Sequence, residues 1–417
     1  ATDAAALIER LATDAVATTD HDAVSLGLDP SGVTARASDA RFASRETVEL
    51  EAGILEGAIT GGFNHPARID PQCAEILWTG VNERLSAQQR QAALRLVASL
   101  DLVTVMTAPA GAGKTTTLGA AADFWQAQGR SLVCLGPSAR AAAELGDSVG
   151  TGRGQTVARW LTARAAAARD AVVIVDEASM LSTRDLAALI ARVHASRSQL
   201  VLVGDPAQIG AVRAPGGMFE HLTHVLRTRV IGLDELHRFT DPDEAAATLR
   251  LREGDSRVLA LYEGAGRIHP AASSADAADA VFHHWHREIE AGRDALMLAQ
   301  TWTDVTALNV RARAAGIATG QITGDPLLTV ASRTASTRGQ VEQRDWRSGD
   351  VLLAKKNTRD LYIGPDPLRN GDRLRVLAST PDQAGLVVAD LRGRGMTVLP
   401  REYLARWAEY GWASTID

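Results

Sequence analysis

The sequence has few cysteines, no long apolar run and no excess of positive charge. Its two cysteines, Cys73 and Cys134, lie far apart without metal-site spacing, which favours two reduced thiols and leaves a disulfide open. No apolar run reaches the roughly 18 residues of a membrane-spanning helix, and the first twenty residues lack the basic and apolar regions of a signal peptide. We therefore expect a cytoplasmic protein without membrane insertion.

The net charge of −6 gives no compositional support for nucleic-acid binding, so any such function must be argued from motifs. The hydrophobic content of 46% and the charged content of 23% are ordinary for a globular protein, and 417 residues suffice for two or three domains. The chain begins with alanine rather than methionine, which suggests a processed protein or an excised fragment.

From residue 85 onward, apolar segments alternate with amphipathic ones. The expected strands are 103–107, 131–135, 172–175, 200–203 and 230–233, and the expected helices between them are 115–128, 139–145 and 183–194. Strands this apolar, separated by helices, predict a parallel sheet that is covered on both faces. The fold class is therefore α/β.

The sequence pattern predicts four regions along the chain. Residues 1–80 are typical of a mainly helical leader, 81–240 of a first α/β domain and 241–294 of a helical connector. A second α/β domain is expected over 295–417, with a strand at 296–299 and a helix at 303–315. Short strands with turn signals at about 340–400 predict a small β-barrel inserted into that domain.

The sequence VTVMTAPAGAGKTTT, at 103–117, predicts a strand, a phosphate-binding loop and a helix. Lys114 is expected to reach the β- and γ-phosphates, and Thr115 to ligate Mg²⁺. The usual pattern begins with glycine where this chain has Ala108, and the alternative is a plain turn rich in alanine and glycine. The predicted nucleotide-binding residues are Pro109, Ala110, Gly111, Ala112, Gly113, Lys114, Thr115 and Thr116.

Polar residues also follow two later strands. Asp176 and Glu177 follow VVIV, where we expect Asp176 to organise Mg²⁺ and Glu177 to act as the base that activates water. The alternative is helix capping by Asp176 or Ser179, which can coexist with catalysis. Gln208 follows the strand that ends in Gly-Asp-Pro-Ala, and its amide suits contact with both the γ-phosphate and water.

These segments belong to a longer ordered series: LSAQQRQAA (85–93), APAGAGKTTT (108–117), LGPSARAAAEL (135–145), VVIVDEASM (172–180), LVGDPAQI (202–209) and LDELHRF (233–239). The series resembles superfamily 1 helicases of the RecD-like group, and more narrowly the helicase part of conjugative relaxase-helicases of the TrwC/TraI (MobF) type. The resemblance implies a RecA-like first domain, an incomplete second RecA-like domain and an SH3-like insertion. It covers roughly residues 40 to 417.

The resemblance also implies two further nucleotide contacts. Gln89 would contact adenine, and Arg238 would act as an arginine finger toward the transferring phosphoryl group. The alternative for Arg238 is a solvated surface charge.

For DNA, the resemblance implies contacts by Ser138, Arg140, Thr156 and Trp160. Trp160 is the expected stacking platform, and a core tryptophan is its alternative. Lys355 and Lys356 lie in a basic part of the β-rich insertion, which implies a second surface for the strand, the alternative being a solvated charged face. His283, His284 and His286 have no ligand partner at useful spacing and indicate surface and core positions.

The leading hypothesis is thus the ATP- and Mg²⁺-dependent helicase region of a conjugative relaxase, acting on single-stranded DNA with 5′ to 3′ polarity and working with other conjugation or relaxosome proteins. EYGWASTID, at 409–417, resembles the opening of a later helicase motif, so we expect the chain to stop before the last motifs. The alternatives are a RecD-like repair helicase and a nucleotide-regulated DNA-binding module without unwinding activity.

Overall fold

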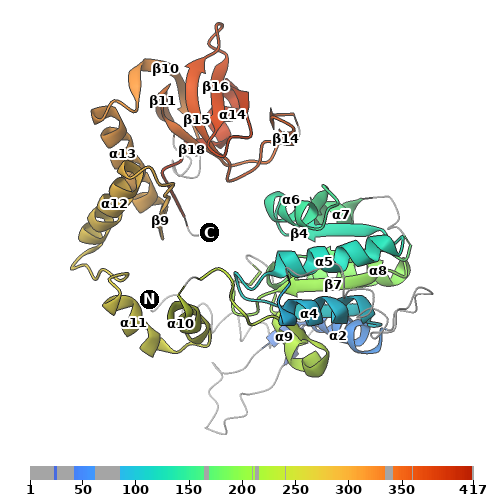
Figure 1. The fold of residues 1–417 in the computed structure, drawn as a ribbon. Helices are drawn as coiled ribbons and strands as arrows, with labels where there is room; N and C mark the ends of the chain where they lie inside the picture. The colour runs from blue at the N-terminus through green and yellow to red at the C-terminus, as the bar shows by residue number, and fades with distance from the viewer. Residues whose placement is uncertain are drawn as a thin grey trace. The chain divides into compact units, whose positions relative to one another are not determined.

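The computed structural model describes residues 23–25, 42–61, 85–163, 169–208, 210–211, 216–239, 241–333, 341–358 and 360–415 (Figure 1). They fall into two compact units, Ala1–Asp255 and Ser256–Asp417. Cys73 lies outside the described residues, and Cys134 is a buried free thiol.

A six-stranded parallel sheet forms the centre of the first unit (Figure 1). The strand order is β5-β4-β6-β7-β3-β8. The strands are β3 (Val103–Thr107), β4 (Leu132–Gly136), β5 (Gly154–Thr156), β6 (Val172–Val175), β7 (Gln199–Gly204) and β8 (Ile231–Gly232). Because all the strands run the same way, the loops that follow β3, β6 and β7 emerge at one edge.

Both faces of this sheet are apolar, because successive side chains of a strand point to opposite sides. In β7, Leu200 and Leu202 belong to one core, whereas Val201 and Val203 belong to the other. All four are fully buried. The prediction of a parallel sheet covered on both faces is therefore confirmed.

Apart from α10, whose described residues belong to neither core, the helices of the first unit pack on these two faces. They are α2 (Arg45–Thr60), α4 (Ala87–Ala98), α5 (Lys114–Ala127), α6 (Ala139–Ser148), α7 (Val157–Thr162), α8 (Thr183–Ala195), α9 (Met218–Leu226) and α10 (Pro242–Arg252), with two short 3₁₀ turns, η2 (Ala178–Met180) and η3 (Arg227–Arg229). The expected helices differ from the observed ones only at their ends. None of the described helices is long and apolar enough to cross a membrane.

The described part of the N-terminal leader consists of α2 and a hairpin of β1 (Ala23–Ser25) and β2 (Phe42–Ser44). Ile54 and Ala58 of α2 are fully buried in one of the two cores, which also contains Ile190 of α8. The remainder of the expected helical region 1–80 lies outside the described residues.

The edge strand β5 is absent from the sequence prediction. Its residues are Gly154, Gln155 and Thr156, which show neither an apolar run nor alternation. They pair with Cys134, Leu135 and Gly136 of β4. Tertiary pairing, rather than local sequence, makes this segment a strand.

The second unit contains a small α/β part and a β-rich part. In the first, β9 (Met297–Ala299) pairs in parallel with β19 (Ala413–Thr415). The helices are α11 (Leu259–Gly264), α12 (Ser274–Glu290) and α13 (Trp302–Ala318), with the 3₁₀ turn η4 (Ser256–Val258) before them. The expected strand and helix at this position are confirmed.

The β-rich part lies in sequence between α13 and β19. Its main sheet is antiparallel in the order β17-β16-β15-β12-β18, beside a hairpin of β10 and β11 and a smaller one of β13 and β14. Its elements are β10 (Thr323–Ser332), β11 (Glu342–Ser348), β12 (Val351–Ala354), β13 (Tyr362–Ile363), β14 (Asp366–Pro367), β15 (Arg373–Ser379), β16 (Gly385–Asp390), β17 (Met396–Pro400), α14 (Arg401–Trp407) and β18 (Ala408–Tyr410). This β-rich part has its own core, and its expected SH3-like character stays a prediction.

The structure divides the chain after Asp255, not at the expected boundary of residue 240. The reason is α10, whose Arg252 donates two hydrogen bonds to the buried Asp205 at the end of β7. The expected connector 241–294 is therefore divided, with α10 in the first unit and α11 and α12 in the second.

A buried ion-pair network joins the two parts of the second unit. Arg313 of α13 donates to Asp350 at 2.8 Å and to Asp345 at 3.1 Å. The Asp350 side chain is 0% exposed. Burial raises the pKa of Asp350, and Arg313 opposes that rise. The hydroxyl of Tyr410 donates to the backbone carbonyl of Asp345 at 2.8 Å.

We expect Arg313→Met to destabilise the second unit by about 3–5 kcal/mol, because it leaves the buried Asp350 carboxylate without its counterion. Urea unfolding followed by circular dichroism measures the loss. Arg406→Met is the control, because Arg406 pairs with Glu402 on an exposed helix face and its loss is expected to cost about 1 kcal/mol or less. Equal losses in the two variants would contradict this account.

Candidate nucleotide-binding site

The loop after β3 has the backbone of a phosphate-binding loop. Gly111 and Gly113 adopt φ angles of 88° and 81°, a region that favours glycine. Gly113 is the N-cap of α5, and no side chain caps this helix start. The N–H groups of the first turn are thus available to an anion, which the helix dipole also favours. Thr115 and Thr116 are exposed on that turn.

Lys114 lies between the predicted carboxylates. Its Nζ is 3.2 Å from Glu177 Oε1 and 3.8 Å from Asp176 Oδ1. Burial raises the pKa of Asp176, while Lys114 lowers it. Glu177 has a φ angle of 53°, which is uncommon outside glycine and is a form of backbone strain found at functional sites. The structure therefore brings together three of the predicted catalytic residues.

The alternative role of Asp176 and Ser179, which was to cap a helix, is found only in part. Asp176 Oδ1 accepts a hydrogen bond from the Glu177 N–H at 2.9 Å. Ser182, rather than Ser179, caps α8. The buried Ser179 hydroxyl has no hydrogen-bond partner among the described residues. A buried hydroxyl without a protein partner is uncommon, and this one lies in the segment that carries the two carboxylates.

The loop after β7 is tied to the phosphate loop. The N–H of Ala108 donates to the Gly204 carbonyl at 3.0 Å, and Gln208 lies exposed in the turn that follows. The Gln208 N–H donates to the Asp205 carbonyl at 3.1 Å. Sequence reasoning singled out Gln208 but missed its neighbour Asp205, which is 3% exposed and bound by Arg252. No local motif marks Arg252, which lies 47 residues away.

The segment 233–239 runs alongside the phosphate loop. The His237 N–H donates to the Gly111 carbonyl at 2.9 Å. A Cβ added to Gly111 would lie 2.7 Å from Arg238 Cβ, so Arg238 packs directly on this glycine. The Arg238 side chain itself is exposed. The predicted finger thus lies beside the loop, and its contact with a phosphoryl group stays a prediction.

Gln89 links this region to α4. It is 5% exposed, and its Oε1 accepts the Ser86 N–H in a capping box. Its Nε2 lies 2.1 Å from where a Gly113 Cβ would be. The structure therefore places Gln89 against the phosphate loop, and its contact with adenine stays a prediction.

The predicted DNA contacts of the first unit are mostly helix caps. Ser138 caps α6 and Thr156 caps α7. Arg140 pairs with Glu144 on an exposed face at 2.8 Å. The expected stacking role of Trp160 is wrong, because this side chain is 5% exposed within the core and the Arg192 guanidinium covers its ring at 4.6 Å. It is the core tryptophan of the alternative.

Lys355 and Lys356 each lie over a tryptophan. Lys355 Nζ is 4.7 Å from the centre of the Trp302 ring, and Lys356 Nζ is 4.6 Å from that of Trp407. The second pair borders a cavity of about 470 Å³ that also includes Tyr403 and Arg406. Trp407 is 36% exposed, and sequence analysis did not single it out.

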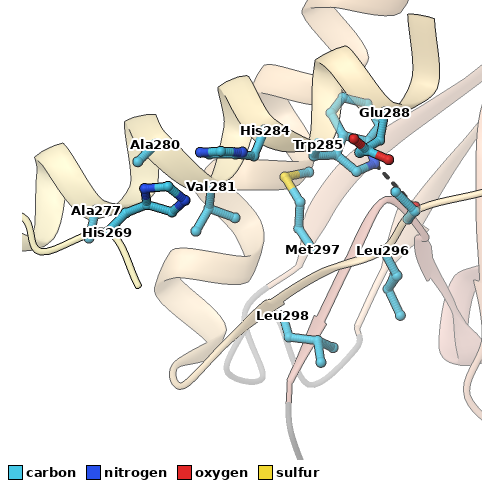
Figure 2. Close-up of a pocket in the computed structure, with 11 residues that line it drawn as sticks. His269, Ala277, Ala280, Val281, His284, Trp285, Glu288, Leu296, Met297 and Leu298 are labelled. Atoms are coloured by element: carbon cyan, nitrogen blue, oxygen red, sulfur yellow. Dashed lines mark hydrogen bonds between the residues drawn. The ribbon is translucent and has the colours of Figure 1, made fainter. Parts of the chain in front are cut away.

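Of the three histidines of α12, His283 and His284 are exposed and His286 is half-buried, so the expected core position is not found among them. Figure 2 shows His284 facing His269 in a cavity of about 490 Å³, with Trp285 donating to the Ala295 carbonyl at 3.2 Å. His286 is instead near Glu290, 3.4 Å away. Among the residues that the structure describes, no group of three or more histidine, cysteine or carboxylate side chains could hold a metal ion.

Residues 84–273 match the family model described as AAA domain. The chain is 27% identical over 382 residues to the conjugal transfer protein TraA of Agrobacterium fabrum, which covers 90% of this chain and 33% of that protein. It is 31% identical over 216 residues to the RecBCD enzyme subunit RecD of Mycolicibacterium smegmatis, covering 44% of this chain and 38% of RecD. Among solved structures it resembles the Pif1 helicase of Candida albicans, with 16% identity, a TM-score of 0.47, and coverage of 80% and 85% of the two chains.

The parallel sheet, the glycine loop before α5 and the matched AAA domain define the class, a P-loop ATPase. The similarity to TraA and to RecD agrees with the resemblance predicted from the motif order. The chain spans about a third of the length of the TraA relative.

We expect Gly113→Ala to weaken nucleotide binding at least about tenfold, a loss of 1.4 kcal/mol. The added Cβ meets Gln89 Nε2 and forces alanine into a φ of 81°. Titration with a fluorescent ATP analogue measures the affinity. Gly129→Ala is the control, since Gly129 has a φ of 74° but open space around its Cβ position. Unchanged affinity in Gly113→Ala would refute the loop assignment.

Proposed function

We propose that this chain is the ATP-driven helicase region of a conjugal transfer protein, moving on single-stranded DNA. The observation that carries the proposal is the position of Lys114, within 3.2 Å of Glu177 and 3.8 Å of Asp176 at the opening of the glycine loop. A cation and two carboxylates at the helix start suit phosphoryl transfer from a nucleoside triphosphate.

The loop residues Pro109 to Thr116 hold the triphosphate, chiefly through backbone N–H groups, and Lys114 neutralises its β- and γ-phosphates. When ATP binds, Lys114 exchanges its carboxylate partners for phosphate oxygens. Glu177 is thereby released to accept a proton from the attacking water. Gln89 contacts the adenine from its place against Gly113.

The donor set near the loop suits Mg²⁺, which favours hard oxygen ligands and binds through one or two carboxylates together with phosphates. Thr115 and Asp176 would hold the ion, and the raised pKa of the buried Asp176 is lowered again by a nearby cation. Mg²⁺, when bound, stabilises the charge that develops on the phosphates. The Ser179 hydroxyl, which has no hydrogen-bond partner among the described residues, lies in the same segment and can bond to a water of this site.

Gln208 and Arg238 complete the site. Gln208 is exposed in a turn tied to the loop, where its amide can contact both the γ-phosphate and the water. Arg238 packs on Gly111 with an exposed guanidinium, and we assign it the charge-neutralising role of an arginine finger.

The DNA surface of the second unit is the cavity beside Lys356, Arg406 and Trp407. Aromatic rings and cations are the groups that single-stranded nucleic acid needs for stacking and backbone contact. Lys355 extends this surface over Trp302. In the first unit, Ser138, Arg140 and Thr156 are the proposed backbone contacts.

The setting in conjugation is supported by the TraA relative, which is aligned over 90% of this chain, whereas the RecD relative is aligned over 44%. We accordingly favour a relaxase-linked helicase over a repair helicase. Polarity from 5′ to 3′, a cytoplasmic location and relaxosome partners belong to this proposal. So does the division into a RecA-like first domain, a second RecA-like domain and an SH3-like insertion.

We expect Glu177→Gln to lower the kcat for ATP hydrolysis by about 10²–10⁴-fold while leaving nucleotide affinity nearly unchanged, because the amide cannot take a proton from water. Steady-state ATPase assays with and without single-stranded DNA measure kcat. Lys114→Ala is the comparison variant and is expected to lose nucleotide binding as well. Turnover that survives in Glu177→Gln would show that Glu177 is not the base.

We expect Trp407→Ala to weaken binding of a fluorescent oligothymidine by about tenfold, since stacking on an aromatic ring contributes about 1–3 kcal/mol per base. Fluorescence anisotropy at fixed salt measures the affinity. Tyr362→Ala removes another exposed aromatic ring, on β13, that is not part of the cavity lining, and is expected to bind as the wild type does. Equal affinity of Trp407→Ala and wild type would remove this cavity from the proposal.

A further inference from the structure

Asp205 is a buried carboxylate that organises the turn carrying Gln208. It is 3% exposed, and its Oδ1 accepts the Ala207 N–H at 3.0 Å. Its carbonyl accepts the Gln208 N–H at 3.1 Å. The direction in which Gln208 leaves the sheet edge therefore depends on where the Asp205 carboxylate is held.

Arg252 holds this carboxylate. Its Nε and Nη2 donate to Asp205 Oδ1 at 2.9 and 2.6 Å. The same oxygen thus accepts three donors, two from the guanidinium and one from the turn. Charge-assisted hydrogen bonds to a buried carboxylate are stronger and more directional than neutral ones. The pair anchors the turn to α10.

The chain around Arg252 contacts both loops of the site. The residues before α10 include His237 and Arg238, which bind and cover Gly111 of the phosphate loop. Arg252 is the last residue of α10, three residues before the first unit ends at Asp255. One stretch of chain therefore contacts the phosphate loop, contacts the β7 loop and then leads into the second unit.

We infer that Arg252 is a positioning residue for ATP hydrolysis, which sets Gln208 through Asp205 and makes its placement depend on α10. This inference rests on the proposed ATPase function. Because Arg252 of α10 binds Asp205, a displacement of α10 moves the turn that carries Gln208.

The test compares Arg252→Ala with Arg250→Ala. Arg250 lies on the same helix and pairs with Asp255 through an exposed guanidinium, so it is the matched control. In Arg252→Ala we expect kcat to fall about tenfold to a hundredfold with little change in KM for ATP, since small displacements of a catalytic group cost this much. Arg250→Ala is expected to keep the wild-type kcat.

A second readout needs no turnover. In the nucleotide-free protein, the Ala207 and Gln208 amides should exchange hydrogen at least tenfold faster in Arg252→Ala than in wild type or Arg250→Ala. Arg252→Lys should restore part of both kcat and protection. It supplies the charge but lacks the two-pronged guanidinium.

A purely structural role is tested with Arg252→Ala combined with Asp205→Asn, which removes the unpaired buried charge. If this double variant recovers the thermal stability of the wild type but not its kcat, the positioning role stands. If kcat recovers together with stability, or if Arg252→Ala matches Arg250→Ala in kcat and exchange, the inference is overturned. Absence of turnover in the wild type, with the exchange difference intact, would instead count against the proposed ATPase function.

Discussion

The parallel pairing of β3 with β7, and of β7 with β6, is the constraint on which the site depends. Parallel strands end at the same edge, so the loops they feed meet there whatever their separation in sequence. The glycine loop, the carboxylate pair and the Gln208 turn follow these three strands. The hydrogen bond from Ala108 to Gly204 fixes the distance between the first loop and the third.

Buried or partly buried arginines connect distant segments in both units. In the first unit, Arg130 donates to Gln199 at 3.2 Å, and Arg252 binds Asp205. In the second, Arg313 joins α13 to the β-rich part. Each of these joins segments far apart in sequence, and each satisfies a polar group that packing has removed from water. Such interactions fix the relative positions of the segments that they join, whereas their net contribution to the free energy of unfolding can be small.

The sequence predicted the first unit best where local signals were strong. The strands β3 and β6 were placed at their observed bounds, because an apolar run followed by a glycine-bearing turn or by carboxylates is distinctive. It failed at β5, which has no such signal, and at Trp160, whose surroundings decide between core and surface. An aromatic residue on an alanine-rich helix is compatible with either place until its neighbours are known.

The sequence by itself determined the chemistry of the loop, because glycine spacing and the lysine, threonine and carboxylate side chains are local properties. It also determined that both faces of the sheet are apolar, because the strands are continuous apolar runs and successive side chains point to opposite faces. Only the tertiary structure decided that Arg252 binds Asp205, that Lys356 lies over Trp407 and that α10 belongs to the first unit. The physical reason is that such contacts depend on where distant segments meet, and no periodicity along the chain encodes that meeting.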